Sequence, residues 1–177
     1  MIKPTELPKA SLLYNQHHNY ADSFEGTVIY LQNSLTATDV AKAFFSSAPT
    51  WVDKLFLIRN KLVRVFGLKT SKNPTNRAEQ LANFNCEVGQ QLGLFKVYSK
   101  SATEVIMGEN DKHLNFRVSL LVTPLQNATR SKNITITTTV TFNNWFGKIY
   151  FMPVRPFHKP IVPTMLKGII RQLEKNK

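Results

Sequence analysis

Two stretches in the second half of the chain alternate apolar and polar side chains with the period of a β-strand. In residues 114–120 the even-numbered positions are apolar, and in residues 134–142 the apolar residues Ile134, Ile136, Val140 and Phe142 oppose a ladder of threonines at 135, 137, 139 and 141. Shorter stretches of the same kind lie at 95–97 and 103–107. One apolar face beside one polar face is typical of an antiparallel sheet covered on one side only. The sequence therefore predicts such a sheet.

The cover for this sheet is predicted to be helical. From Ile161 the apolar residues fall at 161/162, 165/166, 169/170 and 173, which is the three-four spacing of one helix face. This pattern predicts a long C-terminal helix over residues 161–173. A first strand is predicted over residues 20–31, with Gly26 at a bulge or bend.

Two shorter helices are predicted after the first strand. One covers Asp39–Ser46 behind capping residues that include Thr36, and the other runs from Trp51 to Phe66 and is closed by Gly67. Residues 69–93 give no firm assignment. The order of elements predicts an α+β fold in which a curved antiparallel sheet wraps around the C-terminal helix.

Length and composition indicate one globular domain. The 177 residues, 42% apolar and 19% charged, predict a single domain over 20–177 after an N-terminal arm, residues 1–19, that lies over the body. No apolar run reaches the roughly 18 residues that span a bilayer, and the N-terminus lacks a secretory pattern. We therefore expect a cytoplasmic protein. The single cysteine, Cys86, and the lack of metal-ligand or cofactor motifs predict no disulfide, no metal site and no cofactor.

The net charge of +12 makes nucleic acid or an anionic membrane a partner to consider. Only the segment from Lys148 to Lys177 concentrates the bases, with seven of them against Glu174. The remaining bases are scattered, and no recognition helix or RNA-binding motif is present. The pattern argues against specific nucleic-acid binding and favours a basic soluble surface. A basic interaction domain for nucleic acid or membrane remains a third hypothesis.

The order of elements resembles the helix-grip fold of the START-like (Bet v 1-like, SRPBCC) superfamily. Five local motifs are more specific: Tyr20-Ala-Asp-Ser-Phe24, Trp51 with Arg59-Asn60, Phe66-Gly-Leu-Lys69, Gly108-Glu-Asn-Asp-Lys-His-Leu-Asn-Phe-Arg117 and Pro156-Phe-His-Lys-Pro-Ile-Val-Pro-Thr-Met-Leu166. Together they resemble the bacterial domain-of-unknown-function family 2867, over about residues 20–172. Asn110 and Asn115 are amides where the resemblance leads us to expect acids. The resemblance implies a fold and a cavity but no reaction.

In similar helix-grip proteins a ligand lies between the sheet and the C-terminal helix, so the resemblance implies an apolar site with a few polar groups there. The same apolar residues would also form a closed core. The residues we expect to contact a ligand come from the strands, the second helix and the C-terminal segment. They are Trp51, Arg59, Phe116, Trp145, Tyr150, Arg155, His158 and Met165.

His158 is the main polar candidate. It follows Arg155-Pro-Phe and directly precedes the predicted helix, which would place His158, Arg155 and Lys159 beside free N–H groups that could hold a carboxylate or phosphate. A histidine there could also act as acid or base near neutral pH. The alternative is a rigid turn with one capping histidine.

Asp111, His113 and Arg117 form a second candidate set. Positions 113, 115 and 117 share the polar face of a predicted strand, so a hydrogen-bonded cluster is expected there. A surface network or a contact between copies in a homo-oligomer explains these residues equally well. Pairing of Arg59 or Arg117 with Asp22 is a further option.

Three functions follow from these patterns. The first is binding of a small hydrophobic ligand, with an optional anionic end near Arg155 and His158. The second is an enzyme of the cyclase or hydratase kind with His158 or His113 as acid or base, although no catalytic constellation is evident and the catalytic residues are unknown. The third is the basic interaction domain.

Overall fold

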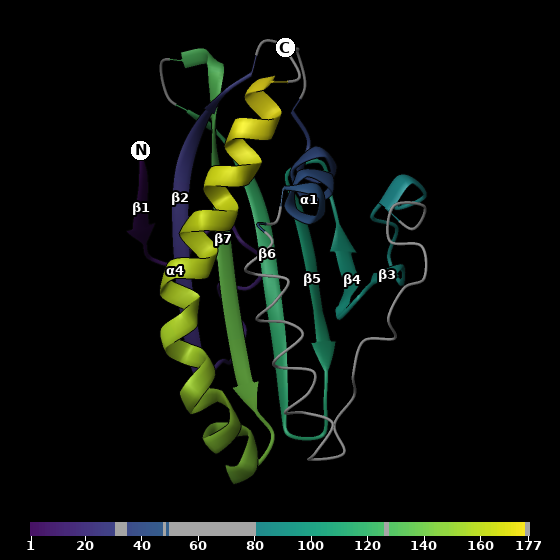
Figure 1. Ribbon diagram of the computed structural model, residues 1–177, viewed down its shortest axis with the longest axis vertical. Helices are drawn as coiled ribbons and strands as arrows, with labels where there is room; N and C mark the ends of the chain where they lie inside the picture. The colour runs from purple at the N-terminus through teal and green to yellow at the C-terminus, as the bar shows by residue number, and fades with distance from the viewer. Residues whose placement is uncertain (31–34, 48, 50–80, 126–127, 176–177) are drawn as a thin grey trace.

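The computed structural model describes residues 1–30, 35–47, 49, 81–125 and 128–175 (Figure 1). The predicted helix from Trp51 to Phe66 lies outside the described residues, and so do two expected ligand residues, Trp51 and Arg59.

A seven-stranded antiparallel sheet forms the body of the protein, in the spatial order β1-β2-β7-β6-β5-β4-β3. The strands are β1 (Ile2–Thr5), β2 (Tyr20–Ile29), β3 (Gln91–Leu92), β4 (Phe95–Lys100), β5 (Glu104–Asn110), β6 (Leu114–Leu125) and β7 (Ala128–Phe142). The two ends of this order are not paired with each other, so the sheet is open. The prediction of an antiparallel sheet is confirmed, and each predicted strand lies within an observed one apart from residues at its ends.

In the described part of the chain, two helices pack on one face of the sheet, α1 (Ala37–Ser46) and α4 (Trp145–Lys175). Figure 1 shows α4 lying along β2 and β7, with α1 beside its C-terminal half in front of β5 and β6. Thr36 caps α1 as predicted, because its side chain accepts from the Asp39 N–H while the Asp39 carboxyl accepts from the Thr36 N–H. The α+β class with a long C-terminal helix is confirmed.

The C-terminal half of α4 closes the main core. Leu166 and Ile169 are fully buried against the sheet face that carries the even-numbered residues of β6 and β7. On this face Leu120 of β6 lies directly opposite Ile136 of β7. Met165, an expected ligand residue, is 5% exposed within this same core. In this half of the molecule the apolar stripes therefore pack together as a closed core.

Gly26 has a different role from the predicted one. β2 pairs with β7 in unbroken register through Gly26, so there is no bulge. A β-carbon at this position would lie 2.8 Å from Ile170 Cδ1 of α4. The glycine therefore lets the helix approach the strand closely.

The opposite face of the sheet is also covered, which corrects the expectation of a sheet covered on one side only. Ser119 and Thr137 on that face are 0% and 1% exposed. The N-terminal segment lies over them: Ser11 Oγ donates to Glu104 Oε1 at 2.6 Å and the Leu12 N–H donates to Oε2 at 3.0 Å. Ser119 Oγ donates to the same carboxyl at 2.5 Å. Three donors thus hold the buried carboxyl group of Glu104, and they fasten the arm to the sheet.

The start of α4 corrects the predicted boundary at about residue 161. Asn144 caps the helix, because its Oδ1 accepts from the Gly147 N–H at 3.1 Å. Four prolines then lie inside the helix, at 153, 156, 160 and 163. Their spacing of three and four residues places them on one side, where the first three are exposed and the last is half-buried. A proline ring pushes away the carbonyl four residues earlier, so prolines on the solvent side bend a helix toward the sheet without breaking it.

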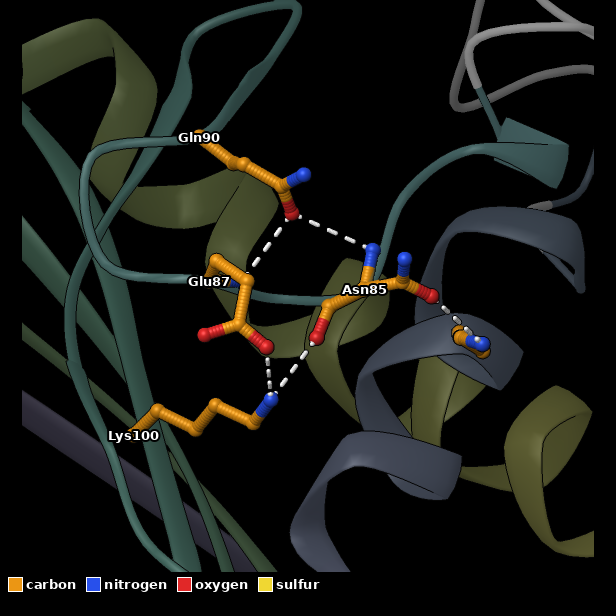
Figure 2. A network of polar contacts seen from close by, with 5 residues as sticks. Asn85, Glu87, Gln90 and Lys100 are labelled. Carbon is orange, nitrogen blue, oxygen red and sulfur yellow. Dashed lines mark hydrogen bonds and ion pairs between the residues drawn. The ribbon is translucent and has the colours of Figure 1, made fainter.

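A network of polar contacts fixes the loop before β3 (Figure 2). Gln90 Oε1 accepts from the N–H groups of Asn85 and Glu87, at 3.1 and 2.9 Å. Lys100 Nζ of β4 donates to Asn85 O at 3.0 Å and to Glu87 Oε1 at 2.6 Å. Cys86 lies between Asn85 and Glu87 and has a positive φ of 57°. This backbone conformation is unfavourable for a residue other than glycine, so the hydrogen bonds made by its two neighbours must hold it in place.

Cys86 is expected to be chemically inert in the folded protein. Burial raises the pKa of its thiol to about 11, although the charges of Lys100 and Lys42 oppose the shift. About one molecule in a thousand would then carry the reactive thiolate at pH 8. Labelling by a disulfide reagent should be at least about a hundredfold slower than in denaturant. Rapid labelling of the native protein would contradict this placement.

Candidate functional site

The candidate site lies where the beginning of β2 faces the middle of α4. Tyr20 and Asp22 are two residues apart on β2, so both side chains point to the helix-covered face, opposite Val140 and Thr138 of β7. His158 projects from α4 onto the same spot, as its contacts with Asp22 and Tyr20 show.

Asp22 is the centre of the polar contacts. Tyr20 donates its hydroxyl hydrogen to Asp22 Oδ2 at 2.8 Å, and His158 Nδ1 lies 3.5 Å from the same oxygen. The side chains of His158 and Asp22 are only 20% and 13% exposed. The second carboxyl oxygen, Asp22 Oδ1, and His158 Nδ1 are both buried and have no hydrogen-bond partner among the described residues.

Aromatic rings surround this polar pair. The Phe151 ring lies 4.9 Å from that of Tyr20, 5.8 Å from that of His158 and 5.7 Å from that of Phe142, measured between centroids. The Tyr20 and His158 rings meet edge-on at 6.0 Å. Phe151 belongs to a small apolar cluster with Leu114 and Val140, separate from the main core. The site is therefore polar at its centre and apolar around it.

Tyr20 stays protonated in this setting. Burial raises the pKa of its hydroxyl well above the usual range, and both the hydrogen bond to Asp22 and the negative charge of Asp22 raise it further. The charge of Arg155, whose guanidinium carbon lies 5.6 Å from the centre of the Tyr20 ring, acts in the opposite direction. Tyr20 is therefore a hydrogen-bond donor and not a base.

His158 was predicted at the start of the C-terminal helix, and this prediction is wrong. Because α4 begins at Trp145, His158 lies well inside the helix, with Arg155 and Lys159 beside it. The free N–H groups of the helix start are therefore not available there to hold an anion, and His158 is not a capping residue. Its partners come from β2 instead.

The other expected ligand residues are distributed around the site. Phe116 and Tyr150 are half-buried against the same small cluster as Phe151. Arg155 is exposed beside Tyr20, while Met165 lies in the main core. Trp145, at 74% exposure, points to solvent. The structure thus brings four of the eight toward one place: Phe116, Tyr150, Arg155 and His158.

The second predicted set is divided between separate contacts. Arg117 donates to Asn110 Oδ1 at 2.7 Å and lies 3.7 Å above the Tyr98 ring. His113 contacts the Phe146 ring at 4.6 Å and pairs with the side chain of Asn144. Asp111 Oδ1 accepts from the neighbouring Lys112 N–H. Arg117 therefore pairs with Asn110 and Tyr98 and not with Asp22.

Sequence reasoning missed the role of Tyr20 and Asp22. The sequence did contain a sign of this role, because Asp22 lies between Tyr20 and Phe24 on the strand face that also carries Val28. A carboxyl group on an apolar face requires a polar partner. Within the described ranges no cluster of three or more histidine, cysteine, aspartate or glutamate side chains is arranged to hold a metal ion.

The fold and the site together define an α+β protein whose long C-terminal helix and open sheet enclose a small polar group ringed by aromatics. Residues 15–165 match a protein family, described as "Protein of unknown function (DUF2867)", and the chain belongs to this family. Among curated proteins, none matches the chain.

Proposed function

We propose that this protein binds a small, mainly hydrophobic ligand at the junction of β2 and α4, and that the ligand carries a hydroxyl group. The observation that supports this is the pair of buried atoms, Asp22 Oδ1 and His158 Nδ1, which lack a hydrogen-bond partner among the described residues. An unpaired buried polar atom costs about 1–3 kcal/mol, and folded proteins keep few of them.

A hydroxyl group matches both atoms. Its one hydrogen can be donated to Asp22 Oδ1 while its oxygen accepts from His158 Nδ1, when that nitrogen carries the hydrogen. An anionic end is less well matched, because the negative charge of Asp22 would repel it and the helix start is elsewhere. The rings of Phe151 and Tyr20, with half-buried Phe116, supply an apolar surround for the rest of the ligand.

We further place the domain in the helix-grip (START-like) superfamily. An open antiparallel sheet with a long C-terminal helix along one face supports this placement. Ligand binding between sheet and helix is what the resemblance to that superfamily implies. The small cluster around Phe151 lies between the sheet and the N-terminal half of α4, apart from the closed core formed by the C-terminal half of the helix.

The role of Asp22 can be tested with matched probes. We expect 2-naphthol and 1-octanol to raise the melting temperature more than their methyl ethers do, because an ether cannot donate a hydrogen bond to Asp22 Oδ1. Asp22→Asn should weaken binding of the alcohols about tenfold or more and leave the ethers nearly unaffected. Asp111→Asn is the control. Equal binding of alcohols and ethers, or an undiminished affinity in Asp22→Asn, would argue that a water molecule alone occupies the site.

A second function is favoured by the distance between His158 and Asp22. A carboxyl group 3.5 Å from an imidazole nitrogen can orient the ring, so His158 is placed to transfer a proton to or from a bound ligand. If the protein is an enzyme of this kind, His158→Gln should retain ligand binding but abolish conversion of the ligand, followed by mass analysis. Unchanged conversion in the variant would exclude His158 as acid or base.

A further inference from the structure

The N-terminal half of α4 carries large apolar side chains on the side that faces solvent. Trp145, Ile149 and Met152 are 74%, 53% and 65% exposed, and Phe157 is 48% exposed. Trp145, Ile149, Met152, Pro156 and Pro160 recur every three or four residues, so they form one stripe along the helix. We call this stripe, with Phe157 beside it, the outward stripe.

The outward stripe is not part of the packing between α4 and the sheet. The side chains that face the sheet in this half of the helix are Phe151, Val154, His158 and Val162, which lie on the opposite side of the helical wheel. Scattered exposed apolar residues are ordinary on a protein surface, but a continuous stripe of them usually marks an interaction site.

A row of bases flanks the stripe. Lys148, Arg155 and Lys159 are exposed and follow each other at intervals of seven and four residues, so they share one flank of the helix. Residues 145–173 contain no acidic side chain. A surface that combines a tryptophan and other large apolar side chains with a row of lysine and arginine complements an anionic lipid surface.

The prolines limit how deeply such a surface can enter a membrane. Because a proline has no N–H, the carbonyl groups of Ile149, Met152, Pro156 and Lys159 receive no hydrogen bond from the residue four positions later. Carbonyl groups without a donor are costly in hydrocarbon but are hydrated at the level of the lipid headgroups. No helix in the described part of the chain is long and apolar enough to span a bilayer.

We infer that the outward stripe and its basic flank form a peripheral docking surface for an anionic lipid membrane, with Trp145 at headgroup depth. The outward stripe lies on the opposite side of α4 from Asp22 and His158, whereas Arg155 of the basic flank also lies beside Tyr20 of that site. The net charge of +12 supports the same partner through long-range attraction.

Sedimentation with lipid vesicles tests this inference on the full chain. We expect the protein to bind vesicles of phosphatidylcholine with 30% phosphatidylserine, and to bind vesicles of pure phosphatidylcholine much more weakly. Binding should weaken as salt increases. In a Trp51→Phe background, Trp145 fluorescence should shift to shorter wavelength when anionic vesicles are added.

Surface variants identify the binding face. Lys148→Gln and Lys159→Gln should each reduce partition into anionic vesicles about fivefold, and the double variant about 25-fold. Met152→Ser should reduce it also, while Lys96→Gln and Val88→Ser, at exposed positions on β4 and in the loop before β3, should have a much smaller effect.

Three results would overturn the inference. One is absence of binding to anionic vesicles at low salt. The second is equal loss of binding in the control variants. The third is a role of the stripe in another contact: dimerisation that Met152→Ser abolishes, or binding to duplex DNA in place of vesicles, would assign the stripe to a second copy of the chain or to nucleic acid.

Discussion

Replacing Glu104 by alanine should lower the free energy of unfolding by about 3 kcal/mol. Glu104 is 3% exposed, and its carboxyl group accepts hydrogen bonds from Ser11 Oγ, Ser119 Oγ and the Leu12 N–H. Alanine would leave all three donors without their acceptor in a buried place and would create a cavity. Urea unfolding followed by circular dichroism measures the change. The N-terminal arm should also become susceptible to proteolysis in the variant.

Two controls separate this effect from a general loss of charge. Glu87→Ala removes an exposed carboxyl group that pairs with Lys100, and it should cost about 1 kcal/mol or less. Ser11→Ala, on the arm itself, should cost less in the Glu104→Ala background than in the wild-type protein, because its partner is already absent. Additive effects of the two substitutions, or a Glu104→Ala variant as stable as wild type, would show that the carboxyl group does not fasten the arm.

Gly147→Ala should destabilise the protein by about 2–4 kcal/mol, although alanine favours a helix. A β-carbon at Gly147, in the first turn of α4, would lie 2.0 Å from the backbone oxygen of His113 and 2.8 Å from its carbonyl carbon. Both are backbone atoms, so no flexible side chain can move aside and either the helix or the turn before β6 must shift. The gain of about 1 kcal/mol in helix propensity does not compensate for this clash.

The same substitution tests where α4 begins. If the helix began near residue 161, as the sequence predicts, Gly147 would lie in a loop and alanine would be tolerated. Lys148→Ala, at an exposed neighbouring position, is the matched control and should change stability by about 0.5 kcal/mol or less. A Gly147→Ala protein as stable as the Lys148→Ala protein would contradict the observed helix start.

The strands could be predicted because their pattern is local. A period-two alternation in β6 and β7 determines which residues face the core without knowledge of the partners, and the observed register places Leu120 opposite Ile136 accordingly. The cover on the second face could not be predicted in this way. Ser119 is a residue type usually found at a surface, and only the contacts of Ser11 and Leu12 with Glu104, which also accepts from Ser119, show that the arm lies over it.

The beginning of α4 was missed because proline is normally read as a helix boundary. The four prolines, however, repeat at helical spacing, so each missing hydrogen bond falls on the same side and most of them face solvent. Asn144 was an available capping signal. The spacing of the prolines, together with this cap, would have predicted a longer helix.

The candidate site was predicted in part. His158 was selected from its place in a polar motif, but its partner could not be, because the two residues meet only when β2 pairs with β7 and α4 crosses them. The polar cluster predicted at Asp111, His113 and Arg117 relied on a shared strand face. That face does not determine partners, and Asn110 and Asn144 bind two of these side chains separately.

We propose that Asp22 and His158 form a ligand site between β2 and α4. Native mass spectrometry of the freshly purified protein and of its Asp22→Asn variant can decide whether they do. We expect a bound compound of roughly a few hundred daltons that is released on denaturation, carries a hydroxyl group and is strongly reduced in the variant. A bare polypeptide mass for both proteins, or the same bound compound in equal amount on both, would contradict the claim.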